Sequence, residues 1–317
     1  LIELIEQAMK EELRDEYIPG VLNLVHGKGS IVGEAIVSHP RVDLISFTGS
    51  TEVGKHINEA AGASLKRVSL EMGGKNAQIV MNDANQELAL DAVLWGAFGT
   101  TGQRCTATSR LILHKEIHDK FIEKLVERVK KLRLGYGNNK DVDVGPCISE
   151  EQRERVNEYV QIGIEQDKAT KIVGGATAAE GELSKGWFYM PTIFIDVKRN
   201  MTIAREEIFG PVLAVLKADS LDESIEILND TPYGLSSSIF TQDVNAAFRA
   251  VRDIKAGITY INGATIGAEA HMPFGGVKET GNGHREGGWT VYDFFTEWKT
   301  VYVDYSGKLQ RAQIDNY

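Results

Sequence analysis

Two periods of apolar residues alternate along this chain, and together they predict an α/β fold. Short apolar runs of the kind that form buried strands lie at 21–25, 43–47, 67–72, 77–81 and 110–114. Apolar residues recur at helical spacing in 1–13, 31–39, 52–62, 87–98 and 117–132. Because the strands and helices alternate, we expect βαβ units and a parallel, doubly wound sheet.

The second half of the chain continues this alternation less regularly. Ser149 with Gln152, and Ser220 with Glu223, have the spacing of capping boxes, which begin helices. Further strands are predicted at 211–218, 236–240, 258–262 and, at the carboxyl end, 298–306. A terminal strand often adds to the edge of another sheet. The change of pattern near Gly73-Gly74 predicts two α/β units, which we place at 1–73 and 74–285, with a tail at 286–317.

Composition and charge narrow the class of protein. The chain has 317 residues, 42% of them apolar, and a net charge of −10, so a nucleic-acid binder is not expected. The sequence contains no apolar run of membrane-spanning length and no signal peptide, and its start within helical spacing, without Met, suggests a piece of a longer protein. Cys105 and Cys147 form no C-x-x-C pair and the seven histidines have no ligand spacing. We therefore expect a reducing, cytoplasmic setting and no metal site.

The turn after the strand at 43–47 has features of an anion site. Gly49, Gly54 and Lys55 have the spacing of a phosphate loop, but His56 stands where such a loop needs a hydroxyl for Mg²⁺. A Gly turn between a strand and a helix leaves backbone N–H groups at the positive end of the helix. Three interpretations stay open from these residues alone: a Mg-nucleotide loop, the pyrophosphate site of a dinucleotide, and a turn that binds nothing.

Two side chains are candidates for covalent chemistry. Glu71 ends the strand at 67–72, at the edge where doubly wound sheets bind ligands, although many such residues only point into water. Cys105 lies in the Gly- and Thr-rich stretch GTTGQRCTATSR, which suits a positioned, partly exposed thiol rather than a buried one. A carboxylate that takes a proton from a thiol or from water is a natural companion for such a thiol.

Five motifs, in this order, resemble the aldehyde dehydrogenase superfamily. They are FTGSTEVG, LEMGGK, GQRCT, EEIFGP and PFGG, and the interval of 34 residues from Glu71 to Cys105 also matches. The resemblance implies an aldehyde dehydrogenase-like fold: the later part of a doubly wound cofactor domain within 1–73, a catalytic α/β domain over 74–285, and a tail with a strand that bridges the subunits of a homodimer or homotetramer.

The resemblance also implies a role for each motif residue. Cys105 would attack an aldehyde carbonyl, with its own N–H as an oxyanion donor, and Glu71 would activate the water that hydrolyses the thioester. This chemistry is hydrolytic rather than CoA-acylating, and its hydride acceptor is NAD or NADP, with NAD favoured. The residues implied to bind the cofactor are Gly29, Gly49, Ser50, Val53, Glu207 and Phe209. Phe274 would line the substrate funnel.

The stretch 261–276 resembles the loop at the aldehyde entrance. Its Gly267-Ala268-Glu269 is similar to family members that oxidise amino-acid semialdehydes, in which loop N–H groups hold a carboxylate. We expect a carboxylate-bearing semialdehyde, such as α-aminoadipic or glutamic semialdehyde; the alternative is a loop that merely closes the pocket.

The resemblance covers only the later two-thirds of the family's length. The absent part would carry an Asn that is the second oxyanion donor and the residues that choose between NAD and NADP. Two rival interpretations therefore stay open: a truncated, non-catalytic family member with a structural role, and a thiol hydrolase that pairs Cys105 with a histidine.

Overall fold

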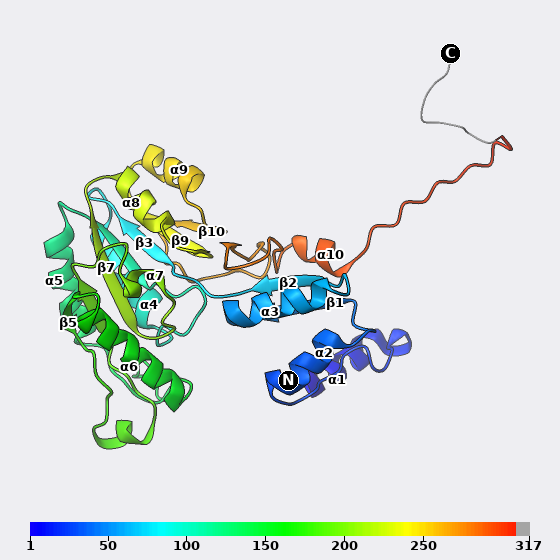
Figure 1. Cartoon of the computed structure of the whole chain (residues 1–317), viewed down its shortest axis with the longest axis horizontal. Helices are drawn as coiled ribbons and strands as arrows, with labels where there is room; N and C mark the ends of the chain where they lie inside the picture. Colours follow the sequence, from blue (N-terminus) through cyan, green and yellow to red (C-terminus); the bar gives the residue numbers. More distant parts are fainter. Residues whose placement is uncertain (309–317) are drawn as a thin grey trace, which may run out of the picture.

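The largest part of the protein is a seven-stranded sheet, seen in a computed structural model that describes residues 1–308 (Figure 1). The strand order is β10-β9-β3-β4-β7-β6-β5, and every pair is parallel except β5 with β6. The strands are β3 (Ala77–Val80), β4 (Arg110–His114), β5 (Thr170–Val173), β6 (Thr192–Ile195), β7 (Val212–Ala218), β9 (Ser236–Phe240) and β10 (Ile258–Ile261). A mainly parallel sheet of this kind is buried on both faces by crossover helices.

Helices cover both faces of this sheet, as the doubly wound prediction requires. The helices are α4 (Gln86–Phe98), α5 (His118–Val129), α6 (Glu150–Glu165), α7 (Thr202–Arg205), α8 (Leu221–Asn229) and α9 (Val244–Asp253). Apolar side chains of α4 and α5 share a core with Leu213 and Val215 of β7, whereas those of α6 to α9 share a second core with Ala214 and Leu216. Successive β7 residues thus point to opposite faces, and both faces are packed.

The two predicted capping boxes begin helices, as expected. Ser149 Oγ accepts a hydrogen bond from the Gln152 backbone N–H at 3.2 Å, and α6 begins at the next residue. Ser220 Oγ accepts from the Glu223 N–H at 3.2 Å at the start of α8. Each hydroxyl satisfies one of the N–H groups that a first helical turn leaves without a partner.

A smaller parallel sheet lies beside the large one. It pairs β1 (Leu44–Thr48) with β2 (Arg67–Glu71), and α3 (Thr51–Gly62) connects them. The chain returns to this sheet near its end, where β11 (Val277–Lys278) pairs with β8 (Tyr233–Gly234) and the Met72 N–H donates to the Thr280 carbonyl at 2.7 Å. The helix α10 (Thr290–Phe295) follows.

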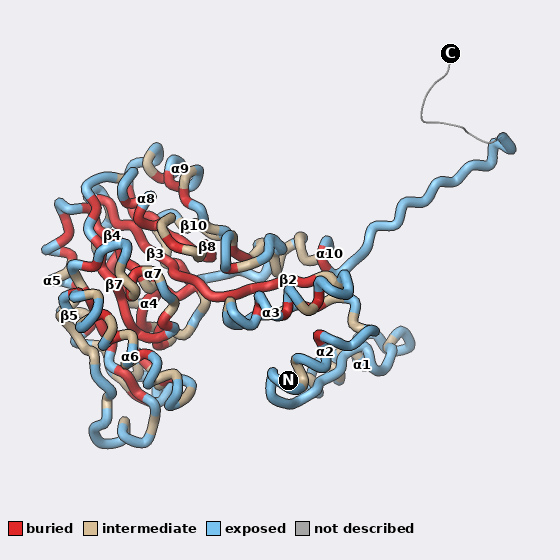
Figure 2. The backbone as a smooth tube through the Cα atoms, in the orientation of Figure 1, coloured by how far each residue is buried: buried red, intermediate tan, exposed pale blue. Residues whose placement is uncertain are grey.

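The prediction of a strand at 21–25 is wrong. Residues 1–36 form α1 (Ile2–Leu13), a short 3₁₀ turn (Arg14–Glu16), a π-helical turn (Gly29–Gly33) and the start of α2 (Glu34–Ser38), with no strand among them. Every residue of 21–25 is exposed, and Figure 2 shows this region in pale blue, in contrast to the red interior of the large sheet. A strand needs a neighbour for its N–H and C=O groups, and no described segment pairs with 21–25.

The strand predicted at 298–306 has no partner within the described chain. The segment carries no strand assignment, and Figure 1 shows it running away from the body of the molecule. Its large side chains are exposed, including Trp298, Tyr302 and Tyr305. Pairing with another subunit stays a prediction, and the end of the predicted tail, 309–317, lies outside the described residues. No helix in the described part of the chain has both the length and the apolar character needed to cross a membrane.

Candidate active site

A cavity of about 660 Å³ lies between the carboxyl ends of the small sheet and the amino ends of the large one. Its lining includes Thr48, Gly49, Ser50, Glu71, Met72, Gly73, Gln103, Arg104, Cys105, Thr106, Gln152, Arg155, Glu207, Phe209, Gly267, Ala268 and Phe274. Two predicted site residues are outside this lining: Gly29 begins the π-helical turn, and Val53 is half-exposed on α3. The structure therefore brings the thiol, the carboxyl group and the Gly49 turn to one space.

Cys105 lies in the loop between α4 and β4. The loop turns tightly, with the Ala107 N–H donating to the Arg104 carbonyl at 3.0 Å, and the thiol is free and partly exposed. Burial raises the pKa of Cys105, the Glu71 carboxyl raises it further, and the backbone N–H of Thr106 lowers it. Cys147, by contrast, is buried, and burial raises its pKa to about 11.

Glu71 ends β2 and is 3% exposed, and neither carboxyl oxygen has a hydrogen-bond partner. Burial raises its pKa to about 8, with a further rise from Glu286 and an opposing effect from Arg285. The loop before Arg285 approaches closely because Gly275 has φ 151° and no side chain: a Cβ there would lie 2.5 Å from Glu71 Oε1. The carboxyl group can thus accept a proton near neutral pH, where an ordinary glutamate is already ionised.

Glu207 follows α7 and reaches across to the segment after β2. Its Oε1 accepts a hydrogen bond from the Gly74 N–H at 3.0 Å, and a Cβ at Gly73 would lie 2.2 Å from Oε2, so a side chain at Gly73 would displace this carboxylate. Burial raises the pKa of Glu207, while the Gly74 N–H and the Lys75 ammonium lower it. A carboxylate held at a cavity wall in this way is a suitable acceptor for the paired hydroxyls of a ribose.

The Gly49 turn connects β1 to α3 and is hydrogen-bonded to the end of β2. The Gly49 N–H donates to the Glu71 carbonyl at 3.0 Å, and Ser50 caps α3 by accepting from the Val53 N–H at 3.4 Å. Lys55, which a phosphate loop would direct at its anion, instead pairs with Glu279 at 2.9 Å. The first-turn N–H groups of α3, next to the lining residue Ser50, fit a pyrophosphate better than a Mg-nucleotide.

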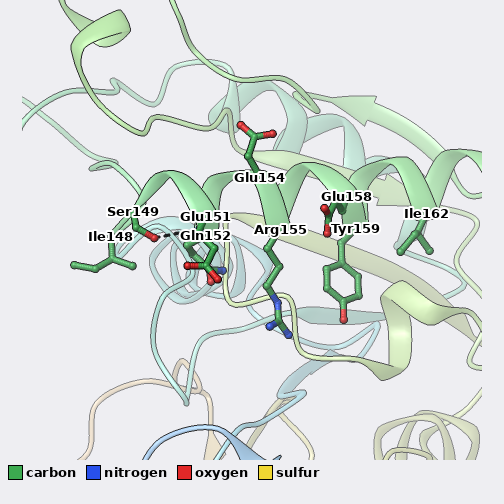
Figure 3. A pocket seen from close by; sticks show the side chains of 9 residues that line it. All are labelled: Ile148, Ser149, Glu151, Gln152, Glu154, Arg155, Glu158, Tyr159 and Ile162. Atoms are coloured by element: carbon green, nitrogen blue, oxygen red, sulfur yellow. Dashed lines mark hydrogen bonds between the residues drawn. The ribbon is translucent and has the colours of Figure 1, made fainter. Parts of the chain in front are cut away.

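Gln152 and Arg155 line the cavity but were not expected from the sequence. Both lie on α6 and also line an adjoining hollow of about 770 Å³ along that helix. Figure 3 shows Arg155 and Tyr159 on the same side of α6, away from Glu154. Gln152 Nε2 donates to the Phe209 carbonyl at 2.9 Å, which links α6 to the loop that carries Glu207. In sequence these residues are indistinguishable from the solvated face of a surface helix.

The fold and the cavity define the class: a doubly wound α/β protein in which a thiol and a carboxyl group lie near the glycine turn that precedes α3. A family model described as "Aldehyde dehydrogenase family" matches residues 2–301, and the chain belongs to this family. Among curated relatives, it is 44% identical over 284 residues to alpha-ketoglutaric semialdehyde dehydrogenase of Bacillus subtilis, covering 90% of this chain and 58% of that protein. The chain thus spans less than two thirds of that relative's length.

Solved structures agree with this assignment. The structure of betaine aldehyde dehydrogenase from Staphylococcus aureus in complex with NAD⁺ is similar with a TM-score of 0.85 and 38% identity, over 90% of this chain and 56% of that one. The structure of an NAD-dependent aldehyde dehydrogenase from Sinorhizobium meliloti has a TM-score of 0.89 and 36% identity, over 95% of this chain and 59% of that one. The aldehyde dehydrogenase-like fold expected from the motifs is thereby confirmed.

Proposed function

We propose that this chain carries the nucleophile, the base and a cofactor-binding carboxylate of a hydrolytic, NAD(P)-dependent aldehyde dehydrogenase. The observation that supports this function most directly is the common cavity lined by Cys105, Glu71 and Glu207. A thiol hydrolase would instead need a histidine near the sulfur, and the described lining of this cavity contains none.

The chemistry divides into two steps, in which each side chain has a separate task. Cys105 Sγ, as the thiolate, forms a bond to the aldehyde carbon, and the resulting oxyanion accepts hydrogen bonds from nearby backbone N–H groups. The bound nicotinamide cofactor supplies the hydride acceptor, so that the substrate becomes a thioester of Cys105. Glu71 then takes a proton from water as the water oxygen attacks the thioester carbon, the C–S bond breaks, and the thiolate is regenerated.

The raised pKa of Glu71, about 8, suits this second step. A general base is most effective when its pKa is near the working pH. A carboxylate with a raised pKa binds a proton more strongly than an ordinary glutamate, and near that pH an appreciable fraction of it is still ionised. Both carboxyl oxygens are buried and neither has a protein hydrogen-bond partner, so no other group of the protein competes for the proton that Glu71 would accept.

NAD is the favoured cofactor in this proposal. The residues present fit a dinucleotide: Gly49 and Ser50 lie at the positive end of α3, where a pyrophosphate would be stabilised, and Glu207 would accept from the ribose hydroxyls. Phe209 would pack by the nicotinamide, while Gly29 and Val53 would lie at the outer, adenosine end. The NAD⁺ complex of the Staphylococcus aureus relative supports NAD over NADP.

The proposed substrate is a semialdehyde that carries a carboxylate. Gly267 and Ala268 line the cavity with Phe274, and Arg104 and Arg155 add positive charge to the same lining. The name of the Bacillus subtilis relative, a ketoglutaric semialdehyde dehydrogenase, supports an acidic semialdehyde. It favours a semialdehyde with a 2-oxo group beside its carboxylate over the amino-acid semialdehydes suggested by the loop alone.

The proposal includes a cytoplasmic homodimer or homotetramer. The unpartnered segment 298–306 and the open edge of the large sheet at β10 support association between copies. Two cysteines without a disulfide between them support a reducing compartment.

The decisive experiment is the reduction of NAD⁺, followed at 340 nm, with the purified chain and a carboxylate-bearing semialdehyde. We expect turnover that Cys105→Ala abolishes and that Cys147→Ala, the matched control, leaves unchanged, with NAD⁺ binding retained in both variants. A chain that binds NAD⁺ but reduces none with any aldehyde would contradict the proposal and favour a non-catalytic role.

Substrate class is tested separately by comparing kcat/KM for the semialdehyde and for an uncharged aldehyde of equal length. A charge-assisted contact to the carboxylate predicts a preference of about tenfold or more for the semialdehyde. Equal values would remove the carboxylate from the proposal and leave the aldehyde chemistry in place.

A further inference from the structure

A buried carboxamide, Asn76, holds the loop that carries the nucleophile. Asn76 lies just before β3 and is 3% exposed. Its Nδ2 donates to the Cys105 carbonyl at 2.7 Å and to the Ala107 carbonyl at 2.9 Å, and its Oδ1 accepts from the Ser236 backbone N–H at 2.9 Å. One side chain thus connects the Cys105 loop to the start of β9.

The backbone of Asn76 binds the far end of the same loop. Its carbonyl accepts from the N–H of Ser109 at 3.2 Å and of Arg110 at 3.0 Å. The loop has no regular hydrogen-bond ladder of its own between α4 and β4, so tertiary contacts hold it. The Asn76 contacts anchor both ends of the Cys105 turn, and the Thr265 hydroxyl, which donates to the Thr106 carbonyl at 2.7 Å, adds a further anchor. The position of Cys105 therefore depends on a residue 29 positions earlier in the chain.

The contact to the Cys105 carbonyl has a direct consequence for the thiol. The peptide group between Cys105 and Thr106 is planar and trans, so its C=O and its N–H point in opposite directions. When the oxygen is held by Asn76, the N–H of Thr106 is directed to the other side, and it lies close enough to the sulfur to lower the pKa of Cys105.

We propose that Asn76 is a positioning residue for the nucleophile: by holding the Cys105 carbonyl, it directs the Thr106 N–H at Cys105 Sγ and so stabilises the thiolate. This inference rests on the proposed function only in taking Cys105 as the nucleophile. Thiolate stabilisation itself is a property of the free chain, because it requires neither an aldehyde nor a cofactor.

The experiment measures the rate at which iodoacetamide alkylates Cys105 as a function of pH in the full chain. Mass spectrometry of the peptides separates this product from alkylation of Cys147. In Asn76→Ala we expect the midpoint of the pH profile to rise by about one unit, so that the rate near neutral pH falls about tenfold. Asn76→Ser, which keeps one donor, should give an intermediate shift.

Gln78 provides the matched control. It is fully buried on β3, and its Nε2 donates to the Thr108 hydroxyl at 2.7 Å and to the Ala92 carbonyl at 3.1 Å, without a contact to Cys105. Gln78→Ala should lower the free energy of unfolding, measured in urea, by an amount similar to Asn76→Ala, yet leave the alkylation midpoint unchanged. If Asn76→Ala does not fold, the comparison of Asn76→Ser with Gln78→Ser replaces it.

An unchanged midpoint in the Asn76 variants, or an equal shift in the Gln78 variants, would overturn the positioning role. Failure of aldehyde oxidation in the wild-type chain, with a shifted alkylation midpoint in Asn76→Ala, would contradict the proposed function and leave the positioning role intact.

Discussion

In two regions of this molecule, the burial of a residue is the opposite of what its polarity suggests. In β9 of the large sheet, Ser236, Ser237 and Ser238 are all buried. Residues 1–36 contain no buried residue, although Leu4, Val21 and other large apolar side chains occur there (Figure 2). The most polar strand of the fold is therefore interior, and an apolar stretch is exposed.

The difference shows that burial depends on what covers a segment as well as on its residue types. The β9 hydroxyls have acceptors: Ser236 Oγ donates to the Thr265 carbonyl at 2.6 Å, Ser237 Oγ to the Ile258 carbonyl at 3.0 Å, and Ser238 to Gly263. Polar groups that keep their hydrogen bonds can be buried at little cost. In residues 1–36, apolar groups lack a covering layer within the described chain.

The largest effect is expected at Glu71, where the two sheets meet. Replacing this base with glutamine should lower steady turnover by about 10²–10⁴-fold, the usual contribution of a general base. Because only the ionised form accepts a proton, wild-type thioester hydrolysis should rise with pH and level off above the pKa of about 8, whereas Glu71→Gln should be insensitive to pH in that range. Stopped-flow absorbance at 340 nm measures both the initial burst of reduced cofactor and the steady-state rate that follows it.

A burst of reduced cofactor should remain in Glu71→Gln, since Cys105 is intact. Loss of the burst together with turnover would give Glu71 a different role. A wild-type profile that levels off near pH 4.5 would show that this carboxyl group is solvated rather than buried like the interior of the large sheet.

The next largest effect is a loss of stability when a buried side chain packed against the large sheet is truncated. Phe121 of α5 is fully buried, and Phe121→Ala should lower the free energy of unfolding by about 3–5 kcal/mol through lost contacts and a residual cavity. Phe248→Ala on α9 is the matched control, because that ring is 68% exposed, and it should change stability by less than about 0.5 kcal/mol. Urea unfolding measures both, and equal costs would contradict the burial seen here.

The smallest change in stability is expected from a substitution within the exposed residues 1–36. Val25 is 66% exposed, so Val25→Ala should change the free energy of unfolding by less than about 0.5 kcal/mol, whereas Val93→Ala on α4 should cost about 2 kcal/mol. A large cost at Val25 in urea unfolding would show that residues 1–36 are covered in solution, for example by another copy of the chain.

Much of the fold could be predicted from the sequence. The apolar runs at 43–47 and 110–114 correspond to β1 and β4, because each has a neighbouring strand to pair with: β1 pairs with β2, and β4 lies between β3 and β7. The run at 21–25 has the same local character but no neighbour, and local pattern cannot show whether a neighbour exists.

The residues of the candidate site could be predicted only in part from the sequence. Glu71 could be singled out because it ends a strand and is followed by two glycines, and Cys105 because it lies within a Gly- and Thr-rich stretch, where a side chain can approach a ligand. Arg155 and Asn76 gave no such signal, since a charged residue on a helix and an amide before a strand are ordinary features. Their positions matter only because α6 and β3 are brought to the Cys105 loop.

The sequence by itself determined the alternating strands and helices, the helix caps at Ser149 and Ser220, and the family to which the motifs belong, because each is written in residues close together in the chain. Only the tertiary structure decided that the carboxyl edge of one sheet faces the amino edge of another, and which groups meet in the cavity between them. Such contacts join residues far apart in sequence, and their energies come from burial and hydrogen bonds that no local pattern contains.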